Sequence, residues 1–146
     1  MNAAPAILKS RRENEIPSVT LAKQWKKLYE AGKAQNPPIA AVTASAFFYL
    51  AWSVQSGRLI VRGALSSRPA LYCFAGLLTL SIVPYTIIAM SKTNAALLTT
   101  ATSDSKVADK ASTDVDELVH KWISLNGFRS LLPLVGGLVG IFAALT

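Results

Sequence analysis

A short stretch near the end of the chain gathers side chains that could do chemistry. Residues 120–130, "HKWISLNGFRS", contain a His, a Trp, an Asn and an Arg directly before an apolar tail. An α-helix turns by about 100° per residue, so Trp122, Asn126 and Arg129 fall within about 60° of one another. His120 is about 200° from Trp122 by the same count and points to another face. By spacing alone, the shared face fits either a polar pocket or ordinary membrane-interface anchors, in which the indole and the guanidinium reach lipid headgroups.

Three apolar segments without any charge predict membrane-spanning helices that would position these residues. They cover residues 39–54, 69–90 and 131–146. Hydrophobic residues make up 51% of the chain and its mean hydropathy is +0.36, which is high for a soluble domain. A span needs about 20 residues to cross a hydrocarbon core of roughly 30 Å, so the first and last segments must take in flanking residues. We place the spans at about 38–56, 69–90 and 129–146, within a single domain of 146 residues.

The segment before the first span has the pattern of an amphipathic helix. Within residues 18–32, Leu21, Trp25 and Leu28 follow the i, i+4, i+7 spacing and form one apolar stripe. We expect this helix to lie along the membrane face. The predicted fold class is therefore all-α, a membrane helical bundle of three spans plus an interfacial amphipathic helix in a four-helix arrangement.

The basic residues predict the orientation of the chain in the membrane. The formal net charge is +7, and twelve of the 15 Lys and Arg residues lie in the N-terminal segment and the second connection. Three spans place these two segments on one side, which the positive-inside rule assigns to the cytosol. The charge then serves topology and lipid headgroup contact, and we expect no nucleic-acid partner. The composition of residues 1–17 and 99–113 predicts a disordered segment and a flexible loop.

Other polar and aromatic residues flank the spans on this same basic face. Trp25 and Tyr29 lie in the amphipathic segment, and Thr93 and Asn94 follow the middle span in "MSKTN". The group at residues 120–129 precedes the last span. We therefore expect these residues to converge.

Two features inside the spans indicate how the helices pack. Gly136 and Gly140 form a small-xxx-small step, which allows two helix backbones to approach closely in lipid. Pro84 has no N–H and predicts a kink in the middle span. The kink could shape a pocket near Tyr85 or could be a purely structural bend.

The sequence has few side chains that could bind a metal ion and none of the usual motifs that bind a nucleotide cofactor. Cys73 is the single cysteine and lies within the middle span, and the chain has one His. A disulfide framework, a thiolate cluster and a multi-His metal site are therefore excluded. The sequence also lacks the phosphate-binding loop and the dinucleotide-binding glycine pattern. We expect no metal and no organic cofactor.

The order of these segments resembles the anthrone oxygenase-like family of small fungal membrane proteins. The resemblance rests on "LAKQWKKLYEAGKAQNPP", "YLAW", "SIVPYTIIAMSKTN" and "KWISLNGFRSLLPL", and it extends over nearly the whole chain from about Ile16. Members of that family look like four-helix membrane proteins that oxidise polyketide anthrones to anthraquinones. The resemblance thus implies an oxygenase of secondary metabolism that uses molecular oxygen without a metal or flavin.

The resemblance also implies roles for particular residues. Five of them match recurring motif positions of the family: Thr93, Asn94, Trp122, Asn126 and Arg129. Arg129 with Asn94 or Asn126 would hold the substrate oxygens, and aromatic rings would stack on the substrate. The choice of base comes from chemistry and not from the resemblance: His120 is the only side chain of the chain whose unperturbed pKa, about 6.5, suits a base near neutrality, and a water held by Asn94 and Tyr85 is the alternative. The catalytic candidates are His120, Arg129, Asn94 and Asn126. The substrate-binding candidates are Trp25, Tyr29, Tyr85, Thr93 and Trp122.

The N-terminus departs from the family pattern. Relatives have an apolar span before the segment that matches "IPSVTLAKQW", whereas this chain has "MNAAPAILKSRRENE", which cannot cross a bilayer. We expect the chain to lack that first span, and a missing wall would open the pocket and impair activity.

Two other functions compete with the enzyme reading. One is a non-catalytic membrane scaffold or accessory protein for a polyketide pathway. The other is a small transporter subunit, which is the weakest because no ionisable residue lies at the centre of a span. The expected partners are an aromatic polyketide substrate and membrane lipids, with homo-oligomer formation left open. The expected location is an intracellular membrane such as the endoplasmic reticulum, with the basic face cytosolic.

Overall fold

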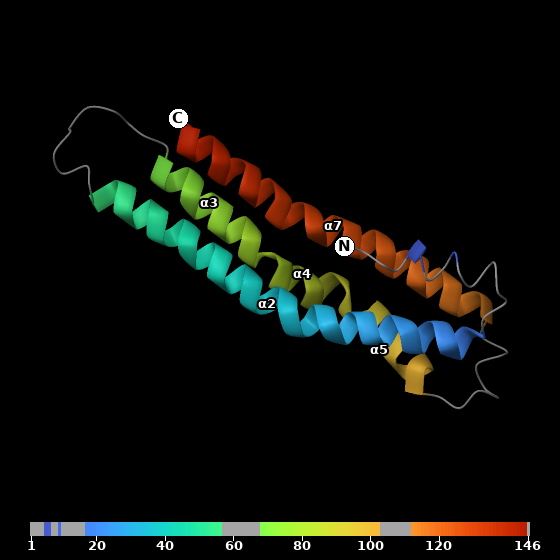
Figure 1. Ribbon diagram of the computed structural model, residues 1–146. Helices are drawn as coiled ribbons and strands as arrows, with labels where there is room; N and C mark the ends of the chain where they lie inside the picture. The colour runs from blue at the N-terminus through green and yellow to red at the C-terminus, as the bar shows by residue number, and fades with distance from the viewer. Residues whose placement is uncertain (1–4, 7–8, 10–16, 57–67, 103–111, 146) are drawn as a thin grey trace. The chain divides into compact units, whose positions relative to one another are not determined.

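The described part of the protein is helical. The computed structural model describes residues 5–6, 9, 17–56, 68–102 and 112–145. Its helices are α2 (Ser18–Ser56), α3 (Arg68–Leu80), α4 (Ile82–Ala89), α5 (Ser91–Thr102) and α7 (Ser112–Leu145) (Figure 1). Within these ranges no strand occurs. The all-α prediction is confirmed.

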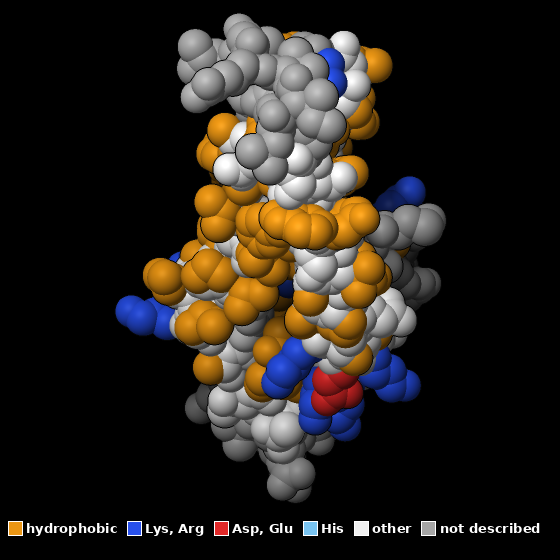
Figure 2. All heavy atoms as spheres, turned by 90° about the vertical axis from the view of Figure 1, so that its left-hand side faces the viewer, with side chains coloured by type: hydrophobic (Ala, Val, Ile, Leu, Met, Phe, Trp, Pro, Cys, Tyr) orange, Lys and Arg blue, Asp and Glu red, His pale blue; other side chains and the backbone are white. Residues whose placement is uncertain are grey.

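Three helical stretches are long and apolar enough to cross a membrane. They are Val19–Ser56, Arg68–Ala89 and Val115–Leu145, with 38, 22 and 31 residues. The prediction of three spans is confirmed. Exposed apolar side chains such as Trp52 and Leu138 gather over these helices, as an apolar solvent requires (Figure 2).

The amphipathic segment and the first span are one helix. The sequence predicted two elements, over residues 18–32 and 38–56, but α2 continues through both and contains Pro37 and Pro38. Each proline removes one intrahelical donor, which weakens a helix without always ending it. The predicted break between the two elements is therefore absent.

The chain divides into two compact units. The first contains Met1–Gln35 and Thr86–Gly127, and the second contains Asn36–Tyr85 and Phe128–Thr146. The single membrane domain over residues 1–146 stays a prediction. Each change from one unit to the other falls within two residues of Pro or at Gly, the residue types that weaken helices most.

Small residues bring the helices of the second unit into close contact. A methyl group at Gly136 would lie 2.9 Å from the carbonyl oxygen of Ala75, and one at Gly140 would overlap the ring of Phe47. Neither position has room for a side chain. The small-xxx-small prediction is confirmed, because both glycines of the step contact a neighbouring helix.

The middle span is interrupted one turn before its proline. α3 ends at Leu80 and α4 begins after Ser81, three residues before Pro84. Pro84 cannot donate to the carbonyl of Leu80, and its ring crowds that oxygen. At the interruption itself, the Ser81 hydroxyl donates a hydrogen bond to the carbonyl oxygen of Leu78, at 2.6 Å. The helix is therefore interrupted at Ser81, three residues before the proline at which the sequence predicted a kink.

Both ends of the loop predicted over residues 99–113 are helical in the structure. Residues 99–102 belong to α5, and α7 begins at Ser112. Thr99 and Thr102 are compatible with a helix because each hydroxyl donates to the carbonyl oxygen four residues earlier, at 3.0 and 3.1 Å. The rest of this predicted loop lies outside the described residues. So does most of the segment 1–17, of which residues 5, 6 and 9 are helical.

Candidate functional site

The helices of the first unit each bury one face. The buried positions are Val19, Leu21, Ala22 and Trp25 in α2, Thr93, Asn94, Leu97 and Ala101 in α5, and Val115, Val119 and Trp122 in α7. Each of them lies three or four residues from another buried position of the same helix, as the 3.6-residue period of a helix requires for a one-sided buried face. These faces are mostly apolar, and their few polar groups belong to residues that the sequence predicted for the site.

Three aromatic rings meet in this unit. The ring of Trp25 stacks on that of Tyr29 with centroids 5.1 Å apart and planes 15° apart. The ring of Trp122 meets Trp25 edge to face, at 5.8 Å and 89°. Offset stacking and perpendicular contacts are the two favourable arrangements of aromatic pairs. The structure thus joins α2 to α7 through residues predicted to bind substrate.

Four buried polar atoms have no hydrogen-bond partner among the described residues. They are Nε1 of Trp25, Nε1 of Trp122, Oδ1 of Asn94 and Oδ1 of Asn126, which we call the unpaired polar group. An unpaired buried polar atom costs about 1–3 kcal/mol, so folded proteins keep few of them. All four belong to the first unit and to residues that the sequence had singled out. The group has the composition of a ligand site, with two donors and two acceptors.

The first turn of α5 carries two of the buried polar residues of the first unit. Thr93 and Asn94 are 3% and 5% exposed. The backbone N–H of Asn94 donates to the carbonyl oxygen of Met90, at 2.9 Å, and so continues the helical pattern across the bend that precedes α5. Met90 is itself buried. The bend after the middle span therefore places an amide within the interior of the unit.

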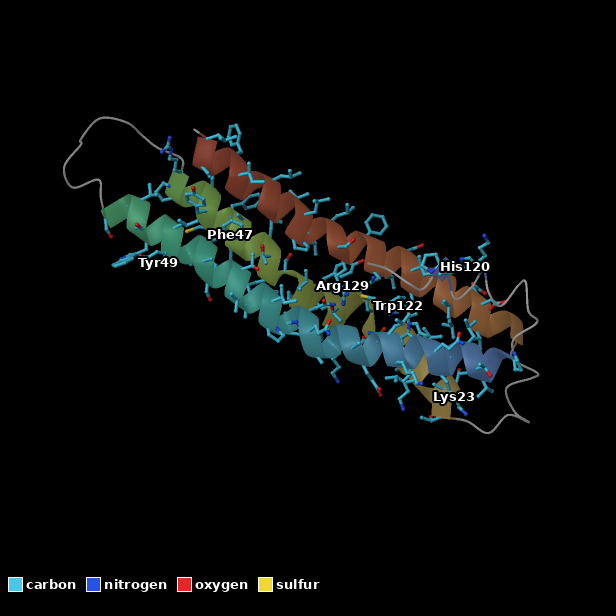
Figure 3. The ribbon with its side chains drawn as sticks, viewed as in Figure 1. Lys23, Phe47, Tyr49, His120, Trp122 and Arg129 are labelled. Atoms are coloured by element: carbon cyan, nitrogen blue, oxygen red, sulfur yellow. The ribbon has the colours of Figure 1, made fainter. Side chains whose placement is uncertain are left out.

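His120 is not part of this interior. Its side chain is exposed, whereas Trp122 is 7% exposed. Figure 3 shows Trp122 on the side of α7 that faces α2 and His120 on the opposite side. The helical phase explains this, because two residues correspond to about 200°. The structure therefore does not bring the predicted base to the other site residues.

Arg129 and Tyr85 belong to the second unit, and both are half-buried there. The helix that carries Arg129, α7, extends from Ser112 to Leu145. The roles of Arg129 and Tyr85 stay predictions.

The described residues suit an organic ligand better than a metal ion. Within the described ranges, no three side chains of His, Cys, Asp or Glu come together. The unpaired polar group offers indole N–H groups and amide oxygens, which recognise hydroxyl and carbonyl groups on a flat molecule.

Some residues of the site were missed from the sequence. Val115 and Val119 are each 1% exposed and lie on the same buried face of α7 as Trp122. Their i, i+4, i+7 spacing with Trp122 was a readable helical signal. The burial of both indole N–H groups without a partner among the described residues was also missed, because the sequence suggested only that their rings stack.

Fold and site define a helical membrane protein whose interior combines aromatic rings with unpaired hydrogen-bonding atoms. Comparison with known protein families identifies the family to which the chain belongs. The family model described as anthrone oxygenase matches residues 25–139, which is most of the chain. The chain belongs to the anthrone oxygenase family.

Curated relatives are similar over most of their length. An anthrone oxygenase, encC, from Aspergillus fumigatus is 35% identical, and the match covers 98% of this chain and 80% of that protein. An anthrone oxygenase from Claviceps purpurea is 32% identical, over 93% of this chain and 72% of its own. A noranthrone monooxygenase from Aspergillus flavus is 33% identical, over 83% and 54%. No solved structure matches the chain significantly.

Proposed function

We propose that this protein is a membrane oxygenase that converts a polyketide anthrone to the corresponding anthraquinone. The observation that carries the proposal is the unpaired polar group beside three aromatic rings, in a chain of the anthrone oxygenase family. An anthrone is flat, aromatic and mostly apolar, with oxygens at its edges. A site of this composition would enclose its rings and pair its oxygens.

The proposed reaction consumes one anthrone and one molecule of oxygen and gives one anthraquinone and one water. The anthrone first loses a proton from its methylene carbon, which converts it to the anthranolate anion. This electron-rich anion passes an electron to oxygen, and a carbon–oxygen bond then forms. One oxygen atom stays as the new carbonyl, and the other leaves as water with the two methylene hydrogens.

The protein has two tasks in this reaction. It must favour loss of the methylene proton and stabilise the negative charge that develops on the substrate oxygens. No cofactor is proposed, because the anthranolate itself supplies the electrons. A positioned base contributes about 10²- to 10⁴-fold and an oxyanion donor about 10²- to 10³-fold. His120 stays the predicted base on sequence grounds alone.

We also propose an intracellular membrane, such as the endoplasmic reticulum, as the location, with the basic segments in the cytosol. The excess of Lys and Arg before the first span and in the second connection supports this orientation. An apolar substrate partitions into lipid, so a membrane enzyme can receive it from the bilayer.

Oxygen uptake by the purified full chain in lipid nanodiscs, with emodin anthrone as substrate, tests the proposed function. We expect one oxygen consumed per anthrone, at a rate well above the spontaneous oxidation measured with empty nanodiscs. We also expect the rate to survive exhaustive chelation. Uptake no faster than in empty nanodiscs would favour a non-catalytic scaffold. Activity lost on chelation and restored by one particular metal would contradict the absence of a cofactor.

A further inference from the structure

The two buried tryptophans of the first unit have N–H groups without an acceptor. Trp25 is 1% exposed and Trp122 is 7% exposed, so solvent has little access to either ring. Neither Nε1 has a hydrogen-bond partner among the described residues. An indole N–H can only donate, so any group that completes these bonds must be an acceptor.

The two donors are held in fixed directions. Tyr29 stacks on one face of Trp25, and Trp122 meets Trp25 at 89°, so the two indole planes are nearly perpendicular. The ring centroids of the two tryptophans are 5.8 Å apart, which is a smaller distance than the length of three fused six-membered rings. Both indole rings therefore lie within the length of one anthrone. Donors held in place before the reaction stabilise charge without reorganisation.

The amides of the same unit have the opposite polarity. The unpaired atoms of Asn94 and Asn126 are Oδ1 oxygens, which accept hydrogen bonds and repel an oxyanion. They fit a substrate hydroxyl. Among the atoms of the unpaired polar group, only the two indole N–H groups can hold a negatively charged oxygen.

We infer that the indole N–H groups of Trp25 and Trp122 donate hydrogen bonds to the oxygen on which negative charge develops when the bound anthrone loses its methylene proton. The inference rests on the proposed function. The charge delocalises from the methylene carbon onto the carbonyl oxygen across the ring, and that oxygen becomes the oxyanion. The two tryptophans then act through their N–H groups and do more than enclose the substrate rings.

Removing one donor should weaken stabilisation of the anion more than binding of the neutral anthrone. A hydrogen bond to a charged acceptor in a buried site corresponds to a factor of about ten to a hundred. Trp25→Phe and Trp122→Phe each remove an N–H and keep an aromatic ring. Trp52→Phe is the matched control, because Trp52 is 65% exposed and belongs to the second unit.

The decisive measurement is the pH at which the bound anthrone ionises. The full chain in nanodiscs is saturated with emodin anthrone under strictly anaerobic conditions, and the absorbance of the anthranolate is followed against pH. We expect the midpoint to rise by about one pH unit in Trp25→Phe and in Trp122→Phe, which is about tenfold in the ionisation equilibrium. Turnover should fall by about tenfold or more, while Trp52→Phe matches the wild type in both measurements.

An unchanged midpoint with weaker binding would show that the rings only stack, and the inference would be wrong. An unchanged midpoint with unchanged binding would show that the indoles pair only with water, which also overturns it. Because Trp25 is among the largest fully buried side chains, Trp25→Phe could fold poorly. Benzothienylalanine at position 25 or 122 keeps the bicyclic shape without the N–H and must give the same shift. A wild-type chain that neither binds nor oxidises the anthrone would overturn the proposed function itself, whereas normal wild-type turnover with unshifted variants would overturn this inference alone.

Discussion

At the scale of single residues, the first unit keeps polar atoms unpaired in a place where folding alone would favour apolar ones. Asn94 is 5% exposed and its Oδ1 has no partner among the described residues. Its neighbours on the buried face of α5 include Leu97 and Ala101. Unpaired buried atoms of this kind are typical of sites that bind a ligand and sacrifice some stability for it.

Asn94→Leu should separate stability from function. The substitution replaces a buried amide by an apolar group of similar size, so it removes an unpaired acceptor. We expect the free energy of unfolding to rise by about 1 kcal/mol and anthrone oxidation to fall at least tenfold. Thermal unfolding in nanodiscs without substrate and oxygen uptake measure the two effects. A variant less stable than the wild type would show that Oδ1 is hydrogen-bonded in the native protein.

Arg129→Lys should impair turnover more than it impairs stability. Arg129 is half-buried, and the sequence predicted that it holds substrate oxygens. Lys keeps the charge but replaces a planar fork of donors by a point charge, which is a poor substitute at a bidentate site. Arg68→Lys is the control, because Arg68 is also half-buried and the sequence predicted no role in the site for it. Unchanged kcat/KM in Arg129→Lys would return Arg129 to the role of a headgroup anchor.

At the scale of helices, the contacts of α7 in the second unit depend on which side a glycine faces. Gly136 lies against the backbone of α3, whereas a methyl group at Gly137 would meet nothing within 4 Å. The two residues are neighbours in sequence, yet about 100° of helix rotation separates their environments.

Gly136→Ala should therefore destabilise the protein, whereas Gly137→Ala should not. A methyl group at Gly136 would lie 2.9 Å from the carbonyl oxygen of Ala75, a backbone atom that cannot move away cheaply. We expect Gly136→Ala to lower the free energy of unfolding by about 1–3 kcal/mol. Gly137→Ala should be neutral or stabilising by up to about 1 kcal/mol, because Ala favours the helix. Denaturation in mixed detergent compares the two, and equal effects would contradict the close helix contact.

At the scale of the whole molecule, the membrane decides which ends of the helices share a side. Three stretches can cross a bilayer, and an odd number of crossings between two segments places them on opposite sides. Ser56 at the end of α2 and Thr102 at the end of α5 are separated by one such stretch and are both exposed. They should therefore face different compartments.

Cysteine labelling tests this arrangement. In a Cys73→Ala background, a membrane-impermeant thiol reagent added to sealed microsomes should label Thr102→Cys from the cytosolic side. Ser56→Cys should be labelled only after the membrane is opened. The positive-inside rule predicts that Thr102 faces the cytosol, because most Lys and Arg residues are expected on the same side of the membrane as Thr102. Labelling of both positions in sealed microsomes would contradict the three-span topology.

The sequence by itself determined the properties that depend on neighbours along the chain. Hydropathy identified the three spans, because a span is a local run of apolar side chains. Helical phase placed Trp122 and Asn126 on one face and excluded His120 from it. The missing N–H of Pro84 predicted the interruption of the middle span.

The tertiary structure alone decided the properties that depend on which helices meet. It brought Trp25 of α2 edge to face with Trp122 of α7, although 96 residues separate them in sequence. It also showed that their N–H groups are buried without an acceptor in the part of the chain that the structure describes. Whether a polar atom is paired depends on every group that packs around it, and those groups come from distant segments. Hydropathy and helical phase describe one helix at a time, so they give the face of each residue but not the residue it meets.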